Sequence, residues 1–587
     1  MSFVSEVIGR AADDPIPVRT LPQMLAETVA KHSARVAIDF LGRRWRYAEL
    51  QRLVDRAARG LQRSGLQPGE RVGLCLPNTP YFVVFYFAIM KAGGIVVNFN
   101  PLYTERELIT QVEDSGTVMM VLPDLRVLHD KLTAVAARTA LRKLIVCSLA
   151  AAMPPLKGLL YGVVKRRAIA PPGAGPLYAP YARLIDNDGC PEDVAIDVHD
   201  VALLQYTGGT TGIPKGAALT HANLTANSAQ EIAVMGMRAD TRILGVLPLF
   251  HVFALTSVLN YAVATGAAMI LLPRFEMKSI LDTIRRTRPT TFPAVPTLYT
   301  AIADAVAAGS PRQAQAMRSI KDCISGGAPL PAEVKHRFEA LTGCRVSEGY
   351  GLSEASPVLT CNRLGEAGPP GSAGQAVIGT VIEIRDLADP SRVLGPGERG
   401  EVCARGPQVM QGYWNRAAET EATMIDGALR TGDIGYLDEN GYLFLVDRIK
   451  DLILCSGYNV YPRTIEEALY RHPDVLEATV IGVPDLYRGE APKAFVALRP
   501  GATATGAALS DFLAREISRI EMPREIEIRA SLPRTLVGKL SKKELVAEEA
   551  GRRAAQADAD ADAGVEGPEA DAAPTADRRD RAGPQAA

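Results

Sequence analysis

The sequence predicts an α/β protein with a large N-terminal domain of layered sheets, a small β-barrel-like subdomain and a small, mobile C-terminal α+β domain. From about residue 20, short apolar runs alternate with helix-like segments, which is the pattern of largely parallel sheets covered by helices. After about residue 385 the chain becomes rich in glycine and turns, and beyond Asp447 a compact α/β pattern follows. The chain of 587 residues is also too long for one hydrophobic core.

The first alternation starts with an amphipathic helix, PQMLAETVAKH, and two short strands, RVAIDF and RWRY. A second helix, AELQRLVDRAARGLQRSG, ends at Gly65, because glycine readily closes a helix. The remaining elements are the strand RVGLCLP, the mostly apolar helix PYFVVFYFAIMKAGG and the strands MMVLPD and KLIVCS. This order favours strands buried on both faces.

Residues 243–273 contain no Asp, Glu, Lys or Arg, and a run of this length could cross a bilayer. Pro248, His251, two glycines and other polar residues interrupt it. We therefore predict a loop over 247–251, a buried helix over 252–265 and a buried strand over 267–272.

The segment MPPLKGLLYGVVKRR has two interpretations. Leu156, Leu160 and Val163 recur at helical intervals and three basic residues follow. A short apolar face beside a basic cluster can rest on an anionic membrane surface. The other interpretation is an ordinary surface helix that covers the domain.

We predict an N-terminal domain over residues 1–447, with the β subdomain at about 375–447, and a C-terminal domain over 448–550. From Gly551 onward the residues are mostly Ala, Asp, Arg, Gly and Pro, without any aromatic side chain. Such a segment buries too little apolar surface to offset its ordering entropy, so we expect residues 551–587 to be disordered.

The overall composition excludes several classes of protein. The formal net charge of −1 provides no basic field for nucleic acid. The eight cysteines include no C-x-x-C pair and fit reduced thiols better than disulfides or a zinc site. The N-terminal residues lack the apolar stretch of a secretory signal, so we expect a cytoplasmic protein.

The run YTGGTTGIPKG, residues 206–216, predicts a phosphate-binding loop. Its glycines let the main chain curl, while three threonine hydroxyls and the ammonium group of Lys215 project from it. The preceding VALLQY is apolar enough for a buried strand. The run differs from a Walker A loop, because Pro214 stands where that motif requires glycine before the lysine.

Three further runs suggest a nucleotide site. In SGGAPL, residues 325–330, glycines would let a flat ring approach the main chain. In EGYGLSE, Tyr350 can stack on adenine and Glu354 can hold a magnesium ion that bridges phosphate oxygens. In RTGDIG, the carboxylate of Asp433 can accept hydrogen bonds from both hydroxyls of a ribose.

Together these runs resemble the motifs of adenylate-forming enzymes, the superfamily of acyl-CoA synthetases, peptide-synthetase adenylation domains and luciferases. The resemblance covers about residues 20–545. Most members carry Ser where Gly208 stands, whereas bacterial long-chain fatty acyl-CoA synthetases carry Gly there. Ser353 replaces the usual Thr of the YGxTE motif, and Ala428 and Arg430 replace the Trp and His that commonly precede TGD.

The resemblance also implies roles for other residues. Lys539, in PRTLVGKLSKKEL, would relieve the repulsion between an incoming carboxylate and the α-phosphate. His251, in PLFHVFAL, would line the acyl pocket as a gate beside the reacting carboxylate. Arg448 would contact the nucleotide, Lys450 would be the hinge of a rotating C-terminal domain, and Ser456–Tyr458 would meet the pantetheine arm of coenzyme A.

The expected catalytic residues are Lys539, Thr210, Glu354 and His251, with Thr210 and Glu354 also holding Mg²⁺. The residues expected to bind ATP or coenzyme A are Thr207, Gly208, Gly209, Thr210, Thr211, Gly212, Lys215, Gly326, Gly327, Ala328, Glu348, Gly349, Tyr350, Gly351, Ser353, Asp433, Arg448, Lys450, Ser456, Gly457, Tyr458 and Lys539.

The activity that the resemblance implies is a ligase reaction that converts a long-chain fatty acid to its acyl-CoA through an acyl-adenylate, with ATP, Mg²⁺ and coenzyme A. A medium-chain or aryl acid CoA ligase and a fatty acyl-AMP ligase are the alternatives. A peptide-synthetase module is disfavoured because no carrier domain follows, and a catalytically silent binding protein because the ion-handling residues are present. Contact with the inner face of the cell membrane and a homodimer stay open.

Overall fold

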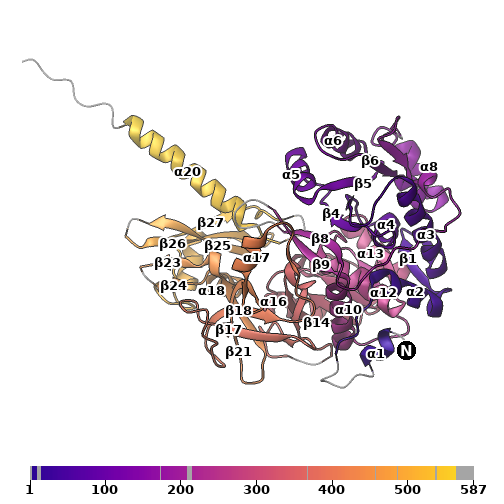
Figure 1. Ribbon diagram of the computed structural model, residues 1–587. Helices are drawn as coiled ribbons and strands as arrows, with labels where there is room; N and C mark the ends of the chain where they lie inside the picture. The colour runs from indigo at the N-terminus through magenta and orange to yellow at the C-terminus, as the bar shows by residue number, and fades with distance from the viewer. Residues whose placement is uncertain are drawn as a thin grey trace, which may run out of the picture.

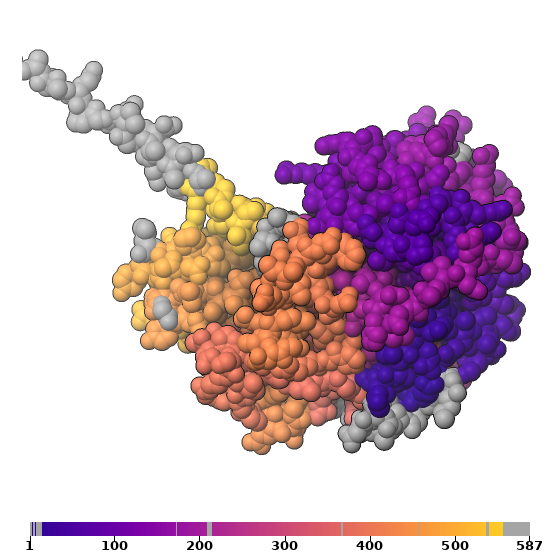
Figure 2. All heavy atoms as spheres, viewed as in Figure 1, coloured from indigo at the N-terminus to yellow at the C-terminus, as the bar shows by residue number. Residues whose placement is uncertain are grey.

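The computed structural model describes residues 3–8, 15–171, 173–207, 214–365, 368–456, 458–485, 487–535 and 539–563. Figure 1 shows the strands β23 to β27 as a smaller C-terminal body beside the rest of the molecule, which we call the N-terminal body, with α20 projecting from the smaller one. Figure 2 shows the same division on the molecular surface. Both bodies contain strands and helices, so the predicted α/β class is confirmed.

The first large sheet has eight strands, and six of them run parallel. In spatial order they are β19 (Gly412–Tyr413), β9 (Lys215–Thr220), β8 (Val201–Thr207), β4 (Ile95–Asn98), β3 (Arg71–Leu74), β5 (Thr117–Pro123), β6 (Lys143–Cys147) and β7 (Tyr178–Pro180). Their apolar runs are continuous because parallel strands are covered on both faces. Only β9 and β19, at one edge, run antiparallel to their neighbours.

The second large sheet has nine strands, with a parallel centre and antiparallel edges. In spatial order they are β16 (Gln375–Ala376), β15 (Val358–Cys361), β14 (Arg345–Gly351), β13 (Asp322–Ser325), β12 (Thr291–Ala294), β10 (Arg242–Gly245), β11 (Ala268–Leu271), β1 (Val36–Phe40) and β2 (Arg43–Arg46). Helices α13 (Met277–Thr287), α14 (Pro296–Ala307) and α16 (Ala332–Thr342) carry the connections.

One hydrophobic core joins the two large sheets. It contains Ile38 of β1 and Val72 of β3 together with the side chains of α4 (Pro80–Lys91). Every residue of α4 from Pro80 to Met90 is buried, which explains why this helix has no polar face. Helices α2 (Leu21–His32), α3 (Tyr47–Arg63) and α10 (His221–Met235) contribute to the same core.

The uncharged stretch 243–273 folds inside this core. It forms β10, a loop, α11 (Val252–Ala254), the π-helical turn η1 (Leu255–Asn260), α12 (Tyr261–Thr265) and β11. The single helix predicted over 252–265 is therefore interrupted by a π-helical turn. Within the described ranges, none of the helices is both long and apolar enough to cross a membrane.

The glycine-rich region forms an antiparallel sheet of five strands, as its turn-rich sequence indicated. The strands are β17 (Val381–Arg385), β18 (Gly400–Arg405), β20 (Met424–Ile425), β21 (Ala428–Leu437) and β22 (Leu443–Arg448). Asp433 of β21 lies opposite Arg448 of β22 in the register. The sheet thus brings two predicted nucleotide-binding residues together.

The C-terminal body has its own sheet and its own core. Its strands are β23 (Ile453–Cys455), β24 (Tyr458–Val460), β25 (Val475–Asp485), β26 (Gly489–Leu498) and β27 (Glu525–Arg529). Helices α18 (Pro462–Tyr470) and α19 (Gly506–Leu513) pack on it and share a cluster of buried residues that includes Ile465 and Leu509. The domain boundaries at 447/448 and 550/551 and the mobility of this body stay predictions.

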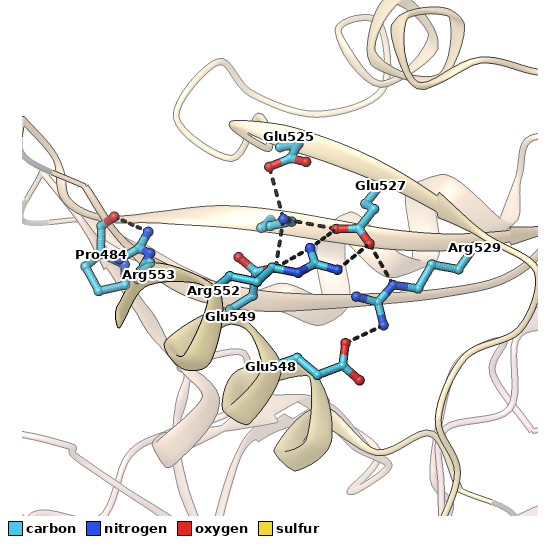
Figure 3. A network of polar contacts seen from close by, with 9 residues as sticks. Pro484, Glu525, Glu527, Arg529, Glu548, Glu549, Arg552 and Arg553 are labelled. Carbon is cyan, nitrogen blue, oxygen red and sulfur yellow. Dashed lines mark hydrogen bonds and ion pairs between the residues drawn. The ribbon is translucent and has the colours of Figure 1, made fainter. Parts of the chain in front are cut away.

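The structure differs from expectation beyond Gly551, because α20 (Lys542–Ala563) continues through residues that composition marked as disordered. A network of ion pairs holds this helix on the sheet (Figure 3). The ammonium group of Lys493 lies 2.9 Å from Glu549 of the helix and 3.1 Å from Glu527 of β27. Arg552, from the predicted tail, lies 2.8 Å from Glu527, whose pKa is lowered to about 2 by Arg552 and its other cationic neighbours. The prediction of disorder considered only how much apolar surface the segment could bury, and it did not include stabilisation by ion pairs.

Candidate active site

A cavity of about 970 Å³ lies where the two large sheets, the antiparallel sheet and the loop before α20 meet. This volume is at the upper end for small-molecule sites. Strands β8 and β13 point their carboxyl ends at it, through Thr207 and Ser325, which is where ligands bind in α/β sheets. Lys215 lies opposite Thr207 across the β8–β9 hairpin. Gly208, Gly209, Thr210, Thr211 and Gly212, between them, lie outside the described residues.

A buried carboxylate lies directly behind one wall of the cavity and has two partners in that wall. Asp433 accepts a hydrogen bond from the hydroxyl of Tyr350 at 2.7 Å and forms an ion pair with Arg448 at 2.9 Å. Burial and the charge of Asp433 raise the pKa of Tyr350 far above its ordinary value, so this hydroxyl stays protonated. The side chain of Asp433 is therefore fixed behind the cavity wall, with polar partners in that wall that a ribose and phosphates could share.

Lys539 reaches this wall from the C-terminal body. Its main chain is held to Thr535, whose hydroxyl accepts from the amide of Lys539 at 3.1 Å. The side chain is half-buried and lines the cavity. Burial and the neighbouring Arg448 lower its pKa to about 8, although Asp433 opposes that shift. At neutral pH the ammonium group is thus charged and poorly solvated, ready to interact with an anion.

The glycines after β13 leave room for Lys539. A β-carbon placed on Gly327 would lie 3.1 Å from the Cε atom of Lys539, and the φ angle of Gly327 is +80°. A β-carbon on Gly326 would lie 3.2 Å from the ring of Phe253. The side chains of Lys539 and Phe253 therefore approach the main chain at these glycines, and the approach of a flat ring predicted for SGGAPL stays a prediction.

His251 caps the short helix α11, where its Nδ1 atom accepts from the amide of Phe253 at 3.3 Å. Burial lowers its pKa to about 3, and the nearby charge of Lys539 adds to the effect. The imidazole is therefore neutral at physiological pH. It can shape the apolar part of the cavity and accept or donate a hydrogen bond, but it supplies no positive charge.

Tyr413 connects the two residues that face the expected phosphates. Its hydroxyl donates to Glu354 at 2.8 Å, and the ammonium of Lys215 lies 5.2 Å from the centre of its ring. Tyr413 reaches this place because β19 pairs with β9. The sequence did not predict it, since its partners are remote along the chain and a lone Gly-Tyr dipeptide carries no functional signal.

Glu354 fits a metal ion only as one ligand among several. Its carboxylate lines the cavity and can offer an oxygen, which is the ligand type that Mg²⁺ prefers. Among the described residues, no three His, Cys, Asp or Glu side chains gather as a metal site. This donor set suits a magnesium ion that arrives with the phosphates of ATP rather than one held by protein alone.

The cavity gathers most of the predicted residues that the structure describes. Those that line it are Thr207, Lys215, His251, Gly326, Gly327, Gly349, Tyr350, Gly351, Ser353, Glu354, Arg448, Lys450 and Lys539. Asp433, Ala328 and Glu348 are not part of the lining, although Asp433 contacts the lining residues Tyr350 and Arg448. Glu348 instead pairs with Lys335 at 3.1 Å.

The hairpin predicted to meet coenzyme A does not line the cavity. Ser456 and Tyr458 lie at the turn between β23 and β24, and 66% of Tyr458 is exposed. Gly457 lies outside the described residues. Lys539 and this hairpin belong to the same body, but only Lys539 faces the cavity in this structure.

Comparison with known proteins identifies the family. Residues 25–414 match the model described as AMP-binding enzyme, and residues 464–539 match that of the AMP-binding enzyme C-terminal domain. The chain belongs to the AMP-binding enzyme family. Both matches include motifs of the cavity, since the first contains the strands β8 to β14 and the second ends at Lys539.

Among AMP-binding relatives, a long-chain-fatty-acid–CoA ligase of Bacillus subtilis (strain 168) is 39% identical over 91% of this chain and 95% of its own length. A protein of the same name from Escherichia coli O157:H7 is 35% identical over 92% and 96%. A feruloyl-CoA synthase of Amycolatopsis sp is also 35% identical, over 85% and 93%.

Solved structures agree with this family. ATP-bound MatB from Rhodopseudomonas palustris is 30% identical, with a TM-score of 0.78 over 89% of this chain and 98% of its own. A benzoate CoA ligase from Burkholderia xenovorans LB400 is 27% identical, with a TM-score of 0.77 over 90% and 100%. ATP is bound in the MatB structure, which shares its fold with this chain. ATP use by this AMP-binding enzyme is consistent with that structure.

Proposed function

We propose that the enzyme converts a long-chain fatty acid to its acyl-CoA in two steps within the described cavity. First, a carboxylate oxygen of the acid attacks the α-phosphorus of Mg·ATP, and the bond to the β-phosphate breaks to release pyrophosphate. The thiolate of coenzyme A then attacks the acyl carbon and displaces AMP. The observation that carries the proposal is Lys539, a charged, half-buried group of the cavity lining that interacts electrostatically with Asp433 and His251.

Lys539 would serve the first step. A carboxylate that approaches an anionic phosphate is repelled, and negative charge grows on the pentavalent centre as the bond forms. A partly desolvated ammonium attracts both groups, and a contact of this kind contributes about 10²–10³ in rate. Thr210 and Lys215 would bind the phosphates, and Glu354 would hold the magnesium ion that accompanies them.

Asp433 and Tyr350 would hold the nucleoside. The carboxylate of Asp433 already accepts from Tyr350 and pairs with Arg448, so its position is set before ligand arrives. Such preorganisation lowers the entropy cost of binding. The neutral His251 would lie beside the acyl carboxylate and would not compete with Lys539 for its negative charge.

In the second step, residues that bind coenzyme A would have to replace Lys539 at the cavity. Lys539 lies against Gly327 in this structure, while Ser456 and Tyr458 are outside the cavity. A rotation of the C-terminal body about Lys450 would withdraw the lysine and bring the β23–β24 hairpin toward the acyl-adenylate. One cavity would thus perform both steps because a mobile domain exchanges its walls.

An aryl acid is the alternative substrate, because the similar proteins include a feruloyl-CoA synthase and a benzoate CoA ligase. Acid-dependent release of pyrophosphate should therefore be measured with palmitate, octanoate, benzoate and ferulate. We expect palmitate to give the highest kcat/KM. Turnover with the aryl acids but without palmitate would refute the proposed substrate, and AMP release that is independent of coenzyme A would favour an acyl-AMP ligase.

We also propose that α8 (Pro155–Val164) rests on an anionic membrane surface at the cytoplasmic face. Its apolar side chains are exposed, Leu156 by 79% and Val163 by 65%, whereas Gly158 is the residue that packs inward. Lys165, Arg166 and Arg167 follow and are exposed. Such an apolar face beside cations suits anionic lipid.

Flotation with vesicles that contain anionic lipid tests this surface. We expect the protein to float with them, the Leu156→Ser, Val163→Ser double variant to stay at the bottom, and high salt to weaken binding. Flotation that is equal for both proteins would refute the assignment. The homodimer stays a prediction.

A further inference from the structure

Helix α10 carries a row of buried polar side chains, and one of them differs from the rest. Asn227 donates to the carbonyl of Val358 at 2.9 Å, and its own carbonyl oxygen accepts from the amide of Val358 at 3.0 Å. Gln230 donates to the carbonyl of Ile378 at 2.8 Å. These contacts fix the helix against neighbouring strands. In Glu231, the next residue, only one of the two carboxyl oxygens has a hydrogen-bond partner of this kind.

Glu231 has only one of its carboxyl oxygens bonded. Its Oε1 atom accepts from the hydroxyl of Ser257 in η1, while Oε2 is buried without a partner among the described residues. The side chain is more than nine-tenths buried, yet it forms part of the cavity lining. A buried polar atom without a partner is costly unless something binds it.

The surroundings of Glu231 supply no counter-charge. Among the described residues, no cation contributes to its pKa, which burial raises to about 8 and the Ser257 bond lowers only in part. The titratable groups that face it are Tyr261 of α12 and Cys361 of β15, and both have pKa values raised above their ordinary range. At neutral pH all three groups are uncharged, so Glu231 offers an O–H donor as well as an acceptor.

The neighbours of Glu231 in the cavity are apolar. Val234 and Met235 line it from the same helix, and Pro357 and Val358 line it at the start of β15. The nucleotide wall of Asp433, Tyr350 and Arg448 belongs to other strands. An alkyl chain would lie along this apolar part, where a single unpaired polar atom can discriminate between acids.

We propose that Glu231 recognises a hydroxyl group carried on the alkyl chain of the fatty acid, so that hydroxylated long-chain acids are preferred substrates. The protonated Oε2 donates to the hydroxyl oxygen. This proposal rests on the proposed function and adds to it the chemical class of the acyl chain. A site built to bind a hydroxyl disfavours the analogue that lacks it, because the polar group then stays buried and unpaired.

The test compares kcat/KM for palmitate with values for hexadecanoic acids hydroxylated at successive positions. For the unaltered enzyme we expect one positional isomer to exceed palmitate by about tenfold, the order of a hydrogen bond to a buried group. Glu231→Leu should remove this preference while palmitate is used as well as before or better. Glu231→Gln, which keeps the shape and a donor, should retain a reduced preference.

Ser257→Ala is the matched control, because it removes the internal partner of Oε1 and leaves Oε2 in place. We expect it to keep the preference. A role that is only structural would lower turnover of all acids together, and the ratio between acids would not move. Melting temperatures show whether each variant is folded, and Glu231→Gln decides the matter if Glu231→Leu does not fold.

Each outcome supports or overturns the proposal. Equal use of palmitate and every hydroxylated isomer, or a preference that survives Glu231→Leu, overturns it and leaves the proposed function intact. Failure of palmitate and of all hydroxylated acids, together with turnover of an aryl acid, refutes the proposed function itself.

Discussion

The buried carboxyl of Glu231 makes the stability of the N-terminal body depend on pH. Its pKa rises on folding from the ordinary 4.5 to about 8 because the charged form loses its hydration. The folded state therefore holds a proton that the unfolded state has lost between these two values. The stabilising contribution is complete below pH 4.5, declines as pH rises and is exhausted above about pH 8.

The size of the effect follows from linkage. Each pH unit in this window costs about 1.4 kcal/mol at most, and the whole window costs on the order of 5 kcal/mol. Glu231→Gln has no titrating proton and keeps an acceptor for Ser257. The difference in unfolding free energy between the two proteins isolates this one group, because all other titrations cancel.

Urea unfolding of both proteins at several pH values between 5 and 9 measures this difference. The transition of the N-terminal body should be followed by itself, since a chain with two bodies need not unfold in one step. We expect the unaltered protein to lose stability relative to Glu231→Gln as pH rises to about 8, and to show a constant difference above that. If the unfolding free energies of the two proteins changed in parallel with pH, Glu231 would not be a buried carboxyl without a counter-charge.

Other predictions concern the cavity and the C-terminal network. Adenylation by the unaltered enzyme should lose kcat/KM above about pH 8 as Lys539 loses its proton, and Lys539→Arg should remove that decline; an unchanged pH profile would contradict the pKa assignment. Asp433→Asn should raise the KM for ATP by about tenfold or more, because Tyr350 and Arg448 lose a charged partner; an unaltered KM would oppose the nucleoside role. Lys493→Met should destabilise the C-terminal body by about 1–3 kcal/mol in urea unfolding, because Glu527 and Glu549 lose one buried cation but keep Arg552 as a partner. A change below about 0.5 kcal/mol would show that Lys493 adds little to the stability of this body.

The sequence predicted those parts of the molecule whose signals are local. Continuous apolar runs such as VALLQY became buried parallel strands, because helices cover both faces of these sheets. The motifs that contain Gly327, Tyr350 and Lys539 come together at one cavity, while the roles predicted for these residues stay predictions. In each of these runs the residues that determine the local structure are neighbours in the sequence. They could therefore be recognised in this one sequence.

What the sequence could not predict depends on contacts between remote segments. Tyr413 meets Glu354 only because β19 pairs with β9. The helix at residues 551–563 depends on ion pairs such as Arg552 with Glu527, which compositional measures do not count. Glu231 lies in a helix whose sequence gives no sign that its carboxyl lacks a second partner, since that follows from packing.

The most direct test measures the two half-reactions separately in the Lys539→Ala variant. It asks whether Lys539 acts only in the first step and leaves the cavity before the second. Pyrophosphate exchange dependent on palmitate measures the first step, and acyl-CoA formation from supplied palmitoyl-adenylate measures the second. We expect the first to fall by about 10²–10³ and the second to remain close to that of the unaltered enzyme. An equal loss in both steps would contradict the exchange of walls and place Lys539 in the site throughout the reaction.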